Sequence, residues 1–271
     1  MTQTILITGA SSGIGKATAK YFQENGWNVV ATMRTPEEET ELTKLDNVLV
    51  THLDVQDSAS IKKAVGTGID TFGKIDVLLN NAGYGSYGVL EATPMEKIRR
   101  QFDVNVIGLL ETTKAVLPHF RENKNGVIIN ISSIGGKMSF PLGTLYHGSK
   151  FAVEGLTEAL SFEMESIGVK VKIVEPGMIK TDFGGRSLDF NNDEKLTEYQ
   201  ELVGKVFAAF GPLAESGSEA VVVAEVIYRA ATDGTNQLRY TAGPDAAKIV
   251  ASRKAADDET FIGGIKAQFG L

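Results

Sequence analysis

The stretch TGASSGIG, residues 8–15, decides the fold. It follows a short apolar run at 4–8 and opens an amphipathic segment near 13–25. Its three glycines allow the backbone to approach another backbone segment or a phosphate closely, and the free N–H groups at a helix start attract an anion. A glycine triplet alone also fits a tight turn. Because a second strand follows about twenty residues on, the context is that of a dinucleotide site.

Short β-branched runs alternate with longer amphipathic segments along the rest of the chain. Most of the runs are continuously apolar, as in strands that are covered on both faces of a parallel sheet. The sequence therefore predicts an α/β fold: a Rossmann-type, doubly wound parallel sheet of about seven strands with helices on both faces, in a single domain over 1–271. The expected strands are 4–8, 28–32, 48–53, 76–80, 126–132 and 169–176, with 236–243 as a candidate for the last, and the expected helices lie near 13–25, 58–72, 94–122, 145–167 and 217–231.

Residues 182–215 interrupt this alternation after the sixth strand. An insertion at the carboxyl end of a strand is well placed to be a substrate lid, and an extra helix packed on the core is the alternative. We predict a helical lid that helps to form an apolar pocket. The C-terminal extension 245–271 could cover that pocket, pack on a neighbouring subunit or be loosely held. The expected pocket residues are Phe183, Leu188, Phe190, Val206 and Phe210 of the lid, with Tyr84 and Tyr87.

Composition narrows the classes of function. The 271 residues carry a formal net charge of −7 and no cysteine, which excludes disulfides, thiolate zinc sites and cysteine nucleophiles. No run of Lys or Arg forms the basic patch that a nucleic-acid-binding protein needs. No stretch resembles a signal peptide or a membrane span, so we expect a soluble, cytoplasmic protein. His52, His119 and His147 are scattered and lack metal-ligand spacing, so no metal is predicted.

Two positions at strand ends bear on the choice of dinucleotide. An NAD site usually has an acidic residue after the second strand, but this chain has neutral Met33 followed by Arg34. The Arg34 guanidinium can offer a planar fork of donors to a 2′-phosphate, which favours NADP(H); the alternative is a solvated surface arginine. After the third strand, Asp54 can accept from the adenine amino group and the Val55 N–H can donate to a ring nitrogen. The alternative for Asp54 is a helix N-cap, for which Ser58 competes.

Seven short stretches complete the pattern. They are TGASSGIG at 8–15, DV at 54–55, NNAG at 80–83, NV at 105–106, ISS at 131–133, YHGSK at 146–150 and PGMIKT at 176–181. With these, the chain resembles the short-chain dehydrogenase/reductase family, in its short, single-domain, NADP-preferring branch. The resemblance covers roughly residues 3–181 by motif and the remainder by length and layout. NNAGYGSYG is similar to the branch that contains hydroxysteroid and retinol-type dehydrogenases and carbonyl reductases.

The resemblance implies roles for individual residues. Ser133, Tyr146 and Lys150 match the family's catalytic triad and Asn105 its fourth member; Ser133 is preferred to Ser132 because of its spacing from Tyr146. The residues expected to contact the substrate are Ser133, Tyr146, Tyr84 and Phe183. The residues expected to contact the cofactor are Gly9, Ser11, Ser12, Gly13, Ile14, Gly15, Arg34, Asp54, Val55, Asn81, Ala82, Gly83, Tyr146, Lys150, Pro176, Gly177, Ile179 and Thr181.

The spacing of Tyr146 and Lys150 suits proton transfer. Residues four apart share a helix face, and a free tyrosine, with a pKa of about 10, is a slow acid or base at neutral pH. A neighbouring ammonium lowers the pKa of a phenol, so we expect Lys150 to lower the pKa of Tyr146 and to bind the nicotinamide ribose. Ser133 would orient the substrate oxygen, and Asn105 would hold a water that links Lys150 to solvent. His147 points about 100° away on the helix and is expected to be non-catalytic.

Each of these residues also has a plainer explanation. Tyr146 and Lys150 could be a surface pair on a helix start, Ser132 and Ser133 could cap the turn after the strand, and Asn105 could be a polar kink in a long helix. Their joint occurrence at these spacings favours catalysis.

The sequence therefore predicts an NADP(H)-dependent oxidoreductase that interconverts a carbonyl and a secondary alcohol on a small to medium apolar substrate, with Tyr146 as general acid/base. One alternative is a reductase of carrier-bound 3-oxoacyl thioesters, which would need a basic docking patch. Another is a non-catalytic NADP(H)-binding sensor, which would typically lack the tyrosine or the lysine. The family resemblance implies a homodimer or homotetramer if the helices near 98–122 and 145–167 carry apolar outer faces.

Overall fold

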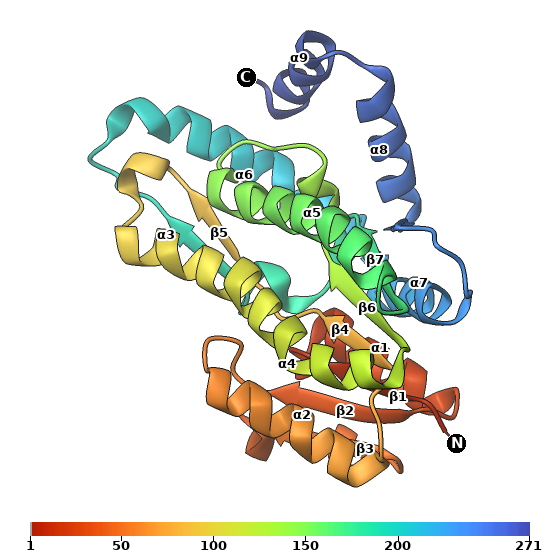
Figure 1. Cartoon of the computed structure of the whole chain (residues 1–271). Helices are drawn as coiled ribbons and strands as arrows, with labels where there is room; N and C mark the ends of the chain where they lie inside the picture. The colour runs from red at the N-terminus through yellow and green to blue at the C-terminus, as the bar shows by residue number, and fades with distance from the viewer. Residues whose placement is uncertain (1) are drawn as a thin grey trace.

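A sheet of seven parallel strands runs through the protein, which is represented by a computed structural model that describes residues 2–271, without the side chains of residues 212–215 (Figure 1). The strand order is β11-β7-β6-β4-β1-β2-β3, so the chain reverses its direction of travel across the sheet between β1 and β4. Ligands of such sheets bind outside the carboxyl ends of the strands at this reversal. The strands are β1 (Thr4–Ile7), β2 (Asn28–Met33), β3 (Val48–His52), β4 (Val77–Asn80), β6 (Gly126–Ile131), β7 (Val169–Pro176) and β11 (Arg239–Ala242).

Helices cover both faces of this sheet. Helices α1 (Gly13–Glu24) and α7 (Ala220–Thr232) pack one face through a core that includes Phe22 and Ile227. Helices α2 (Ser58–Phe72), α4 (Gly108–Asn123) and α5 (Thr144–Glu165) cover the other face through a second core. The predicted doubly wound α/β fold is confirmed, including the last strand.

One predicted helix is divided into three segments. Residues 94–122 form α3 (Met95–Phe102), a π-helical turn at Asp103–Ile107 and α4. A π turn inserts a residue into the helical ladder and is common at functional sites. Asn105 lies within this turn, so the polar position that the sequence singled out marks a change of helix geometry.

Two small sheets join distant parts of the chain. Strand β5 (Gly85–Gly88) pairs in parallel with β9 (Leu188–Asn191), and β8 (Ile179–Lys180) pairs in parallel with β10 (Ser218–Glu219). The sequence did not predict these strands. Together with α6 (Gln200–Glu215) they place the segment 182–215 beside the chain that follows NNAG.

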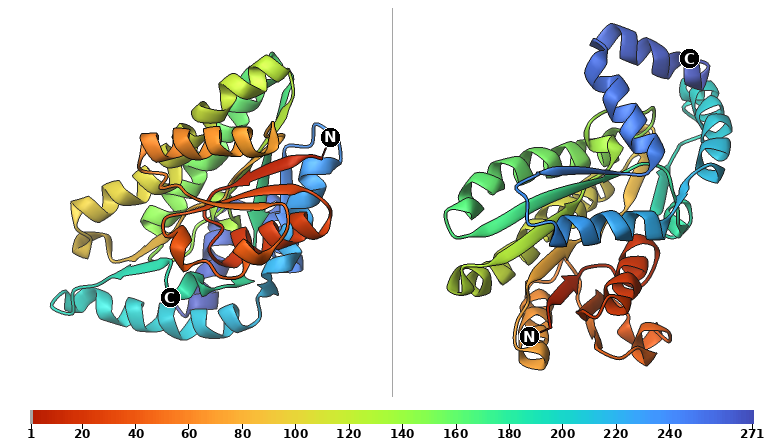
Figure 2. Two further views of the ribbon diagram at one scale, coloured as in Figure 1. Left: turned by 90° about the horizontal axis from the view of Figure 1, so that it is seen from below. Right: turned by 90° about the vertical axis from the view of Figure 1, so that its right-hand side faces the viewer.

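The C-terminal extension forms helices α8 (Pro244–Ala255) and α9 (Asp258–Phe269). Figure 2 shows this blue arm rising from β11 and turning back toward α6. Its last helical residue, Phe269, is buried against Phe140 and Phe210, with ring centroids 6.4 and 5.4 Å away. Helix α9 therefore packs against Phe210 of the predicted lid, and covering of the pocket by the extension stays a prediction.

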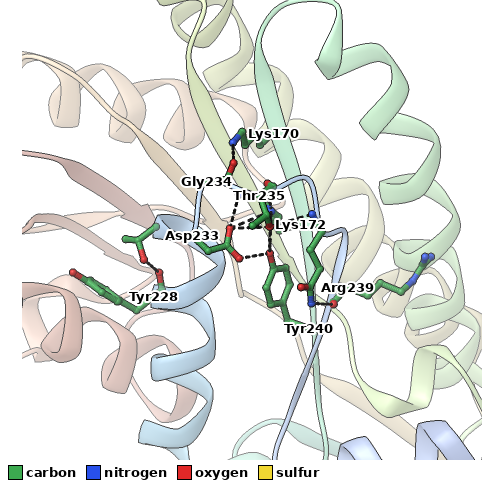
Figure 3. Close-up of polar contacts among 10 residues, drawn as sticks. Lys170, Lys172, Tyr228, Asp233, Gly234, Thr235, Arg239 and Tyr240 are labelled. Carbon is green, nitrogen blue, oxygen red and sulfur yellow. Dashed lines mark hydrogen bonds and ion pairs between the residues drawn. The ribbon is translucent and has the colours of Figure 1, made fainter.

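A buried lysine fixes the loop that enters β11 (Figure 3). The Nζ of Lys172, on β7, donates to the Thr235 carbonyl at 2.6 Å and to the Tyr240 hydroxyl at 2.9 Å, and lies 3.6 Å from an Asp233 oxygen. The Tyr240 hydroxyl in turn donates to Asp233 at 2.7 Å. The Lys172 side chain is 1% exposed and Tyr240 is buried. Removal of the ammonium would therefore leave the Tyr240 hydroxyl without its donor, while Asp233, whose side chain is 20% exposed, can still reach water.

We expect Lys172→Met to lower the free energy of unfolding by about 2–3 kcal/mol, because it leaves Asp233 and the Tyr240 hydroxyl without their buried cation. Urea unfolding followed by circular dichroism would measure this. Lys170→Met is the control: Lys170 lies two residues away on the same strand and binds the Gly234 carbonyl at the surface, and its loss should cost less than about 0.5 kcal/mol. Equal losses in the two variants would contradict a special role for the buried lysine.

Candidate active site

The loop between β1 and α1 has the geometry of an anion cradle. Gly9 has a φ of +70°, which favours glycine, and a Cβ added at Gly15 would lie 2.2 Å from the Gly9 carbonyl oxygen. Ser12 precedes α1 without a side-chain capping bond, so the first N–H groups of the helix remain available for a ligand. These features fit the diphosphate of a dinucleotide.

The NNAG stretch holds this loop in place. The Asn81 side-chain amide donates to the Thr8 and Gly9 carbonyls at 2.9 and 3.0 Å. The Thr8 hydroxyl accepts from the Asn81 and Ala82 N–H groups at 2.9 and 3.0 Å. Asn81 is among the residues expected from the family resemblance to contact the cofactor. Its contacts place it as a clamp on the glycine loop, and it also lines the adjoining cavity.

A single cavity of about 640 Å³ extends from this loop along the carboxyl ends of the strands. Every residue predicted to contact the cofactor lines it, except Gly15, which lies behind the loop. All the predicted substrate contacts, Ser133, Tyr146, Tyr84 and Phe183, line it as well. The fold therefore brings the separate motifs to one site.

Arg34 and Asp54 lie at the end of the cavity formed after β2 and β3. Arg34 is exposed and forms no ion pair with the side chains that the structure describes, which leaves its guanidinium available to an anion. One Asp54 oxygen accepts from the Gln56 N–H at 3.0 Å. The N-cap of α2 is Asp57, whose carboxylate accepts from the Ala59 N–H at 2.9 Å. Neither Asp54 nor Ser58 is the cap, so that explanation of Asp54 is wrong.

Ser133, Tyr146 and Lys150 meet in the middle of the cavity. Ser133 follows β6, and its hydroxyl accepts from the Gly135 N–H at 3.0 Å. Tyr146 and Lys150 lie on the first two turns of α5. The Lys150 Nζ donates to the Ile131 carbonyl at 2.9 Å and lies 5.8 Å from the centre of the Tyr146 ring.

The electrostatics differ from the expectation at Tyr146. Burial raises the pKa of Tyr146, while the neighbouring Ser133 hydroxyl lowers it by a smaller amount. The Lys150 Nζ lies over the ring and is directed to a backbone carbonyl, so desolvation of the phenol prevails. The pKa of Tyr146 therefore lies above its ordinary value in this structure, and the predicted net lowering is wrong. Burial also lowers the pKa of Lys150 to about 8, against an opposing effect of the Glu154 charge.

His147 has a structural role that the sequence did not reveal. The imidazole is 3% exposed; its Nε2 accepts from the Phe140 N–H at 3.0 Å and its Nδ1 is 2.9 Å from the Gly135 carbonyl. Because Nε2 accepts, Nδ1 carries the proton and donates to Gly135. Burial lowers the pKa of His147, consistent with a neutral ring. His147 thus ties the loop after Ser133 to α5.

Asn105 does not line the cavity. Its side-chain oxygen accepts from the Tyr84 N–H at 3.1 Å, and its amide donates to the Tyr84 carbonyl at 2.9 Å and the Ser149 hydroxyl at 3.1 Å. These contacts join the π turn, the chain after NNAG and α5. The predicted water link to Lys150 stays a prediction.

Aromatic side chains form the far end of the cavity. Tyr87 and Phe183 lie with ring centroids 5.3 and 5.7 Å from that of Tyr146. The lid residues named from the sequence, Phe183, Leu188, Phe190, Val206 and Phe210, all line the wall. The guanidinium carbon of Arg100 lies over the Tyr84 ring, 5.2 Å from its centre.

The described residues contain neither a cluster of metal ligands nor a membrane-spanning helix. Outside the undescribed side chains, no group of three or more His, Asp or Glu residues could hold a metal ion. Among the helices described, none has the length and apolarity required to cross a bilayer.

Comparison with known proteins agrees with this geometry. Residues 3–192 match the family model of short chain dehydrogenases. An uncharacterised oxidoreductase of Schizosaccharomyces pombe is 48% identical over 239 residues, which are 88% of this chain and all of that protein. A 3-ketodihydrosphingosine reductase of Bacteroides thetaiotaomicron is 44% identical over 199 residues, 73% of this chain and 71% of that protein.

A solved structure with the same fold was determined with NADP bound. The NADP-bound structure of the protein ElxO superimposes with a TM-score of 0.73 at 30% identity, covering 89% of this chain and 98% of that one. The geometry and the relatives agree. The site combines the glycine cradle with the cluster of Ser133, Tyr146 and Lys150. The chain belongs to the short-chain dehydrogenase/reductase family and is an oxidoreductase of that family.

Proposed function

We propose that this protein is an NADP(H)-dependent oxidoreductase that interconverts a carbonyl and a secondary alcohol on a small to medium apolar substrate. The observation that carries the proposal is the position of Ser133, Tyr146 and Lys150 in one cavity between the glycine loop and a wall of aromatic side chains. A nucleotide at the loop and an apolar molecule at the wall would meet at these three residues.

The residues along the strand ends fit a nicotinamide dinucleotide. The glycine loop at 8–15 would hold its diphosphate, Arg34 its 2′-phosphate, Asp54 and Val55 its adenine, and the segment 176–181 its nicotinamide end. The bound cofactor supplies or accepts the hydride. Arg34 without a described acidic partner, and Met33 in place of an acid, support a preference for NADP(H).

Tyr146 would exchange the proton. Because burial raises its pKa, Tyr146 keeps its proton at neutral pH. It can pass that proton to the much more basic oxygen that forms when a carbonyl is reduced. Ser133, beside it, would donate a hydrogen bond to the same oxygen. The Lys150 ammonium would stabilise the phenolate that donation leaves behind. In the reverse direction the same groups would remove the alcohol proton.

The wall of the cavity favours a ketone or alcohol over a carrier-bound thioester. Phe140 and Phe210 line the cavity, and Phe269 of the C-terminal arm packs against both rings. These contacts support an enclosed apolar wall rather than an open channel for a carrier arm. The similar 3-ketodihydrosphingosine reductase, by its name, acts on a ketone. A non-catalytic sensor has less support, because Tyr146 and Lys150 are both present and both line the cavity.

The outer faces of α4 and α5 support a homodimer or homotetramer. Phe151, Leu156 and Phe162 of α5 and Ile107 of the π turn before α4 are exposed, Phe162 to 73%. Exposed large apolar side chains grouped on helices are typical of contact surfaces. Analytical ultracentrifugation would test this assembly, and a monomer at micromolar concentration would contradict it.

A panel of apolar ketones and secondary alcohols, assayed with NADPH and with NADH at matched concentrations, tests the proposed function. We expect oxidation of NADPH with at least one apolar ketone, and a kcat/KM for NADPH at least about tenfold above that for NADH, the effect of one phosphate contact. Thioesters of 3-oxo acids serve as the comparison. Turnover of the thioesters alone would contradict the proposal. Tight NADPH binding without turnover of any tested compound would contradict it as well.

A further inference from the structure

A buried carboxylate lies one helical turn beyond Lys150. Glu154 and Lys150 are four residues apart on α5, share its inner face and are 4% and 8% exposed. Gly136 makes room for this arrangement, since a Cβ there would lie 2.9 Å from both the Glu154 Cγ and the Lys150 carbonyl oxygen. The described ion pairs include none between these two side chains, since Lys150 is directed to the Ile131 carbonyl and Glu154 to Arg239. The carboxylate therefore acts on the ammonium at longer range, through a poorly hydrated site in which opposite charges attract more strongly than on a surface.

The Glu154 charge is only partly matched by its direct partners. One oxygen accepts from the Arg239 Nε at 2.9 Å and lies 3.8 Å from the Lys137 Nζ. The other oxygen is buried and has no hydrogen-bond partner among the described residues. Arg239 is also shared with Glu158, to which its Nη2 donates at 2.5 Å. The remaining field of Glu154 therefore acts on the groups around it, Lys150 included.

A second buried carboxyl sits beside the first. Glu175, on β7 next to Pro176, is 2% exposed and has an oxygen 3.6 Å from the Arg239 Nε that makes no hydrogen bond in the described structure. Burial and the Glu154 charge raise the pKa of Glu175 to about 7. Two adjacent buried carboxyls do not both ionise readily, and Glu154 has the closer contact with Arg239. Of these two carboxyls, the Arg239 guanidinium therefore pairs chiefly with Glu154.

We propose that Glu154 is a positioning residue for proton transfer, whose buried charge keeps the Lys150 ammonium protonated beside Tyr146. The part of this inference that concerns catalysis rests on the proposed function. The motif YHGSK at 146–150 ends before residue 154 and assigns it no role.

The other charged groups around this region do not substitute for Glu154. Glu158, further along α5, is 53% exposed and paired with Arg239 of β11. Lys137, after Ser133, and Lys254 of α8 line a second cavity of about 280 Å³ together with Glu175. Arg229 of α7 lies over the Tyr240 ring at 5.9 Å. The cations among these groups would favour loss of the Lys150 proton. Glu154 is the buried carboxylate on the same face of α5, and its charge opposes that loss.

The sign of the effect follows from the lysine. Burial lowers the pKa of Lys150 to about 8 and the Glu154 charge opposes that change. Removing the charge should lower the pKa further, so the ammonium would be lost at a lower pH. Nuclear magnetic resonance of protein with 13C-labelled lysine, with the Lys150 signal assigned from Lys150→Arg, measures this titration without any substrate.

We expect Glu154→Gln to lower the pH midpoint of the Lys150 titration by about one pH unit. The glutamine can still accept from Arg239, so the fold should be kept. Glu158→Gln is the matched control, because it removes an exposed carboxylate from the same arginine, and its midpoint should stay at the wild-type value. Glu154→Asp retains the charge, so its midpoint should lie closer to that of the wild type than to that of Glu154→Gln. An unchanged midpoint in Glu154→Gln, or equal midpoints in the Gln and Asp variants, would overturn the inference.

The activity arm separates this inference from the proposed function. With a ketone substrate and NADPH, the reduction rate is measured as a function of pH. The pH at which this rate falls on the alkaline side should be lower in Glu154→Gln, together with the midpoint of the Lys150 titration. Glu158→Gln should keep the wild-type pH profile. A lowered midpoint in a protein that reduces no carbonyl would sustain the charge coupling and refute the proposed function. A lowered midpoint with an unchanged pH profile in an active enzyme would refute the catalytic role of Glu154.

Discussion

Tyr146→Phe is expected to lower kcat by about 10²–10⁴, the usual contribution of a general acid or base, while the Kd for NADPH changes less than about threefold. The substitution removes one oxygen atom and keeps the ring that packs against Tyr87 and Phe183. The proton would then have to come from water, because Ser133 is too weak an acid and Lys150 is directed to the Ile131 carbonyl. Single-turnover kinetics with preformed enzyme–NADPH complex would measure the chemical step, and fluorescence titration would measure NADPH binding.

Tyr87→Phe is the matched control for this result. Tyr87 lines the same cavity, stacks on Tyr146 at 5.3 Å, and loses the same atom in the variant. Burial raises the pKa of Tyr87 well above its ordinary value, with a smaller effect from Tyr146, so it is a poorer proton donor. A rate within about fivefold of wild type is expected, since only pocket polarity changes. If Tyr87→Phe loses as much as Tyr146→Phe, or Tyr146→Phe stays near the wild-type rate, the assignment of the acid is wrong.

The predictable part of the molecule is the part that local sequence determines. Continuous apolar runs such as TILI at 4–7 and GVIINI at 126–131 can be read as buried parallel strands, and all seven are present. The residues expected around the cofactor come from strand ends, which a parallel sheet gathers at one edge. Their convergence on one cavity follows from topology, once the strand order is known.

The parts that could not be predicted depend on contacts between distant residues. GSYG at 85–88 and LDFN at 188–191 are too short and irregular to indicate strands, yet they pair across a hundred residues of chain. The His147 contacts depend on a loop that the helix start does not specify. The pKa of Tyr146 was misjudged because sequence spacing reports the nearness of Lys150 but not the desolvation of the phenol.

The same distinction applies to Asn105. Its position in NV indicated importance, but a π turn has no sequence signal, and the residue binds Tyr84 and Ser149 rather than facing the cavity. Here the motif marks a structural junction that shapes the site from behind. A role in positioning the chain at Tyr84 is therefore compatible with the resemblance that singled the residue out.

Arg34→Ala is expected to raise the Kd for NADPH by about 10–100-fold and the Kd for NADH by less than about twofold. Hydrogen bonds from a charged donor are worth about 1.5–3 kcal/mol, and only NADPH carries the 2′-phosphate. Because Arg34 is exposed, the penalty should shrink as salt rises from 0.05 to 0.5 M, on the order of the screening expected for surface charges. Isothermal titration calorimetry with both cofactors at both salt concentrations would measure these changes.

Arg100→Ala distinguishes a phosphate contact from the general attraction of a cation for an anionic cofactor. Arg100 is also exposed, lines the same cavity and has no ion pair with the described side chains, but it lies over the Tyr84 ring. Its loss should weaken NADPH and NADH by similar, small factors. If Arg34→Ala also weakened both cofactors equally, its guanidinium would contribute only to the overall field, and the preference for NADP(H) would have to come from another residue.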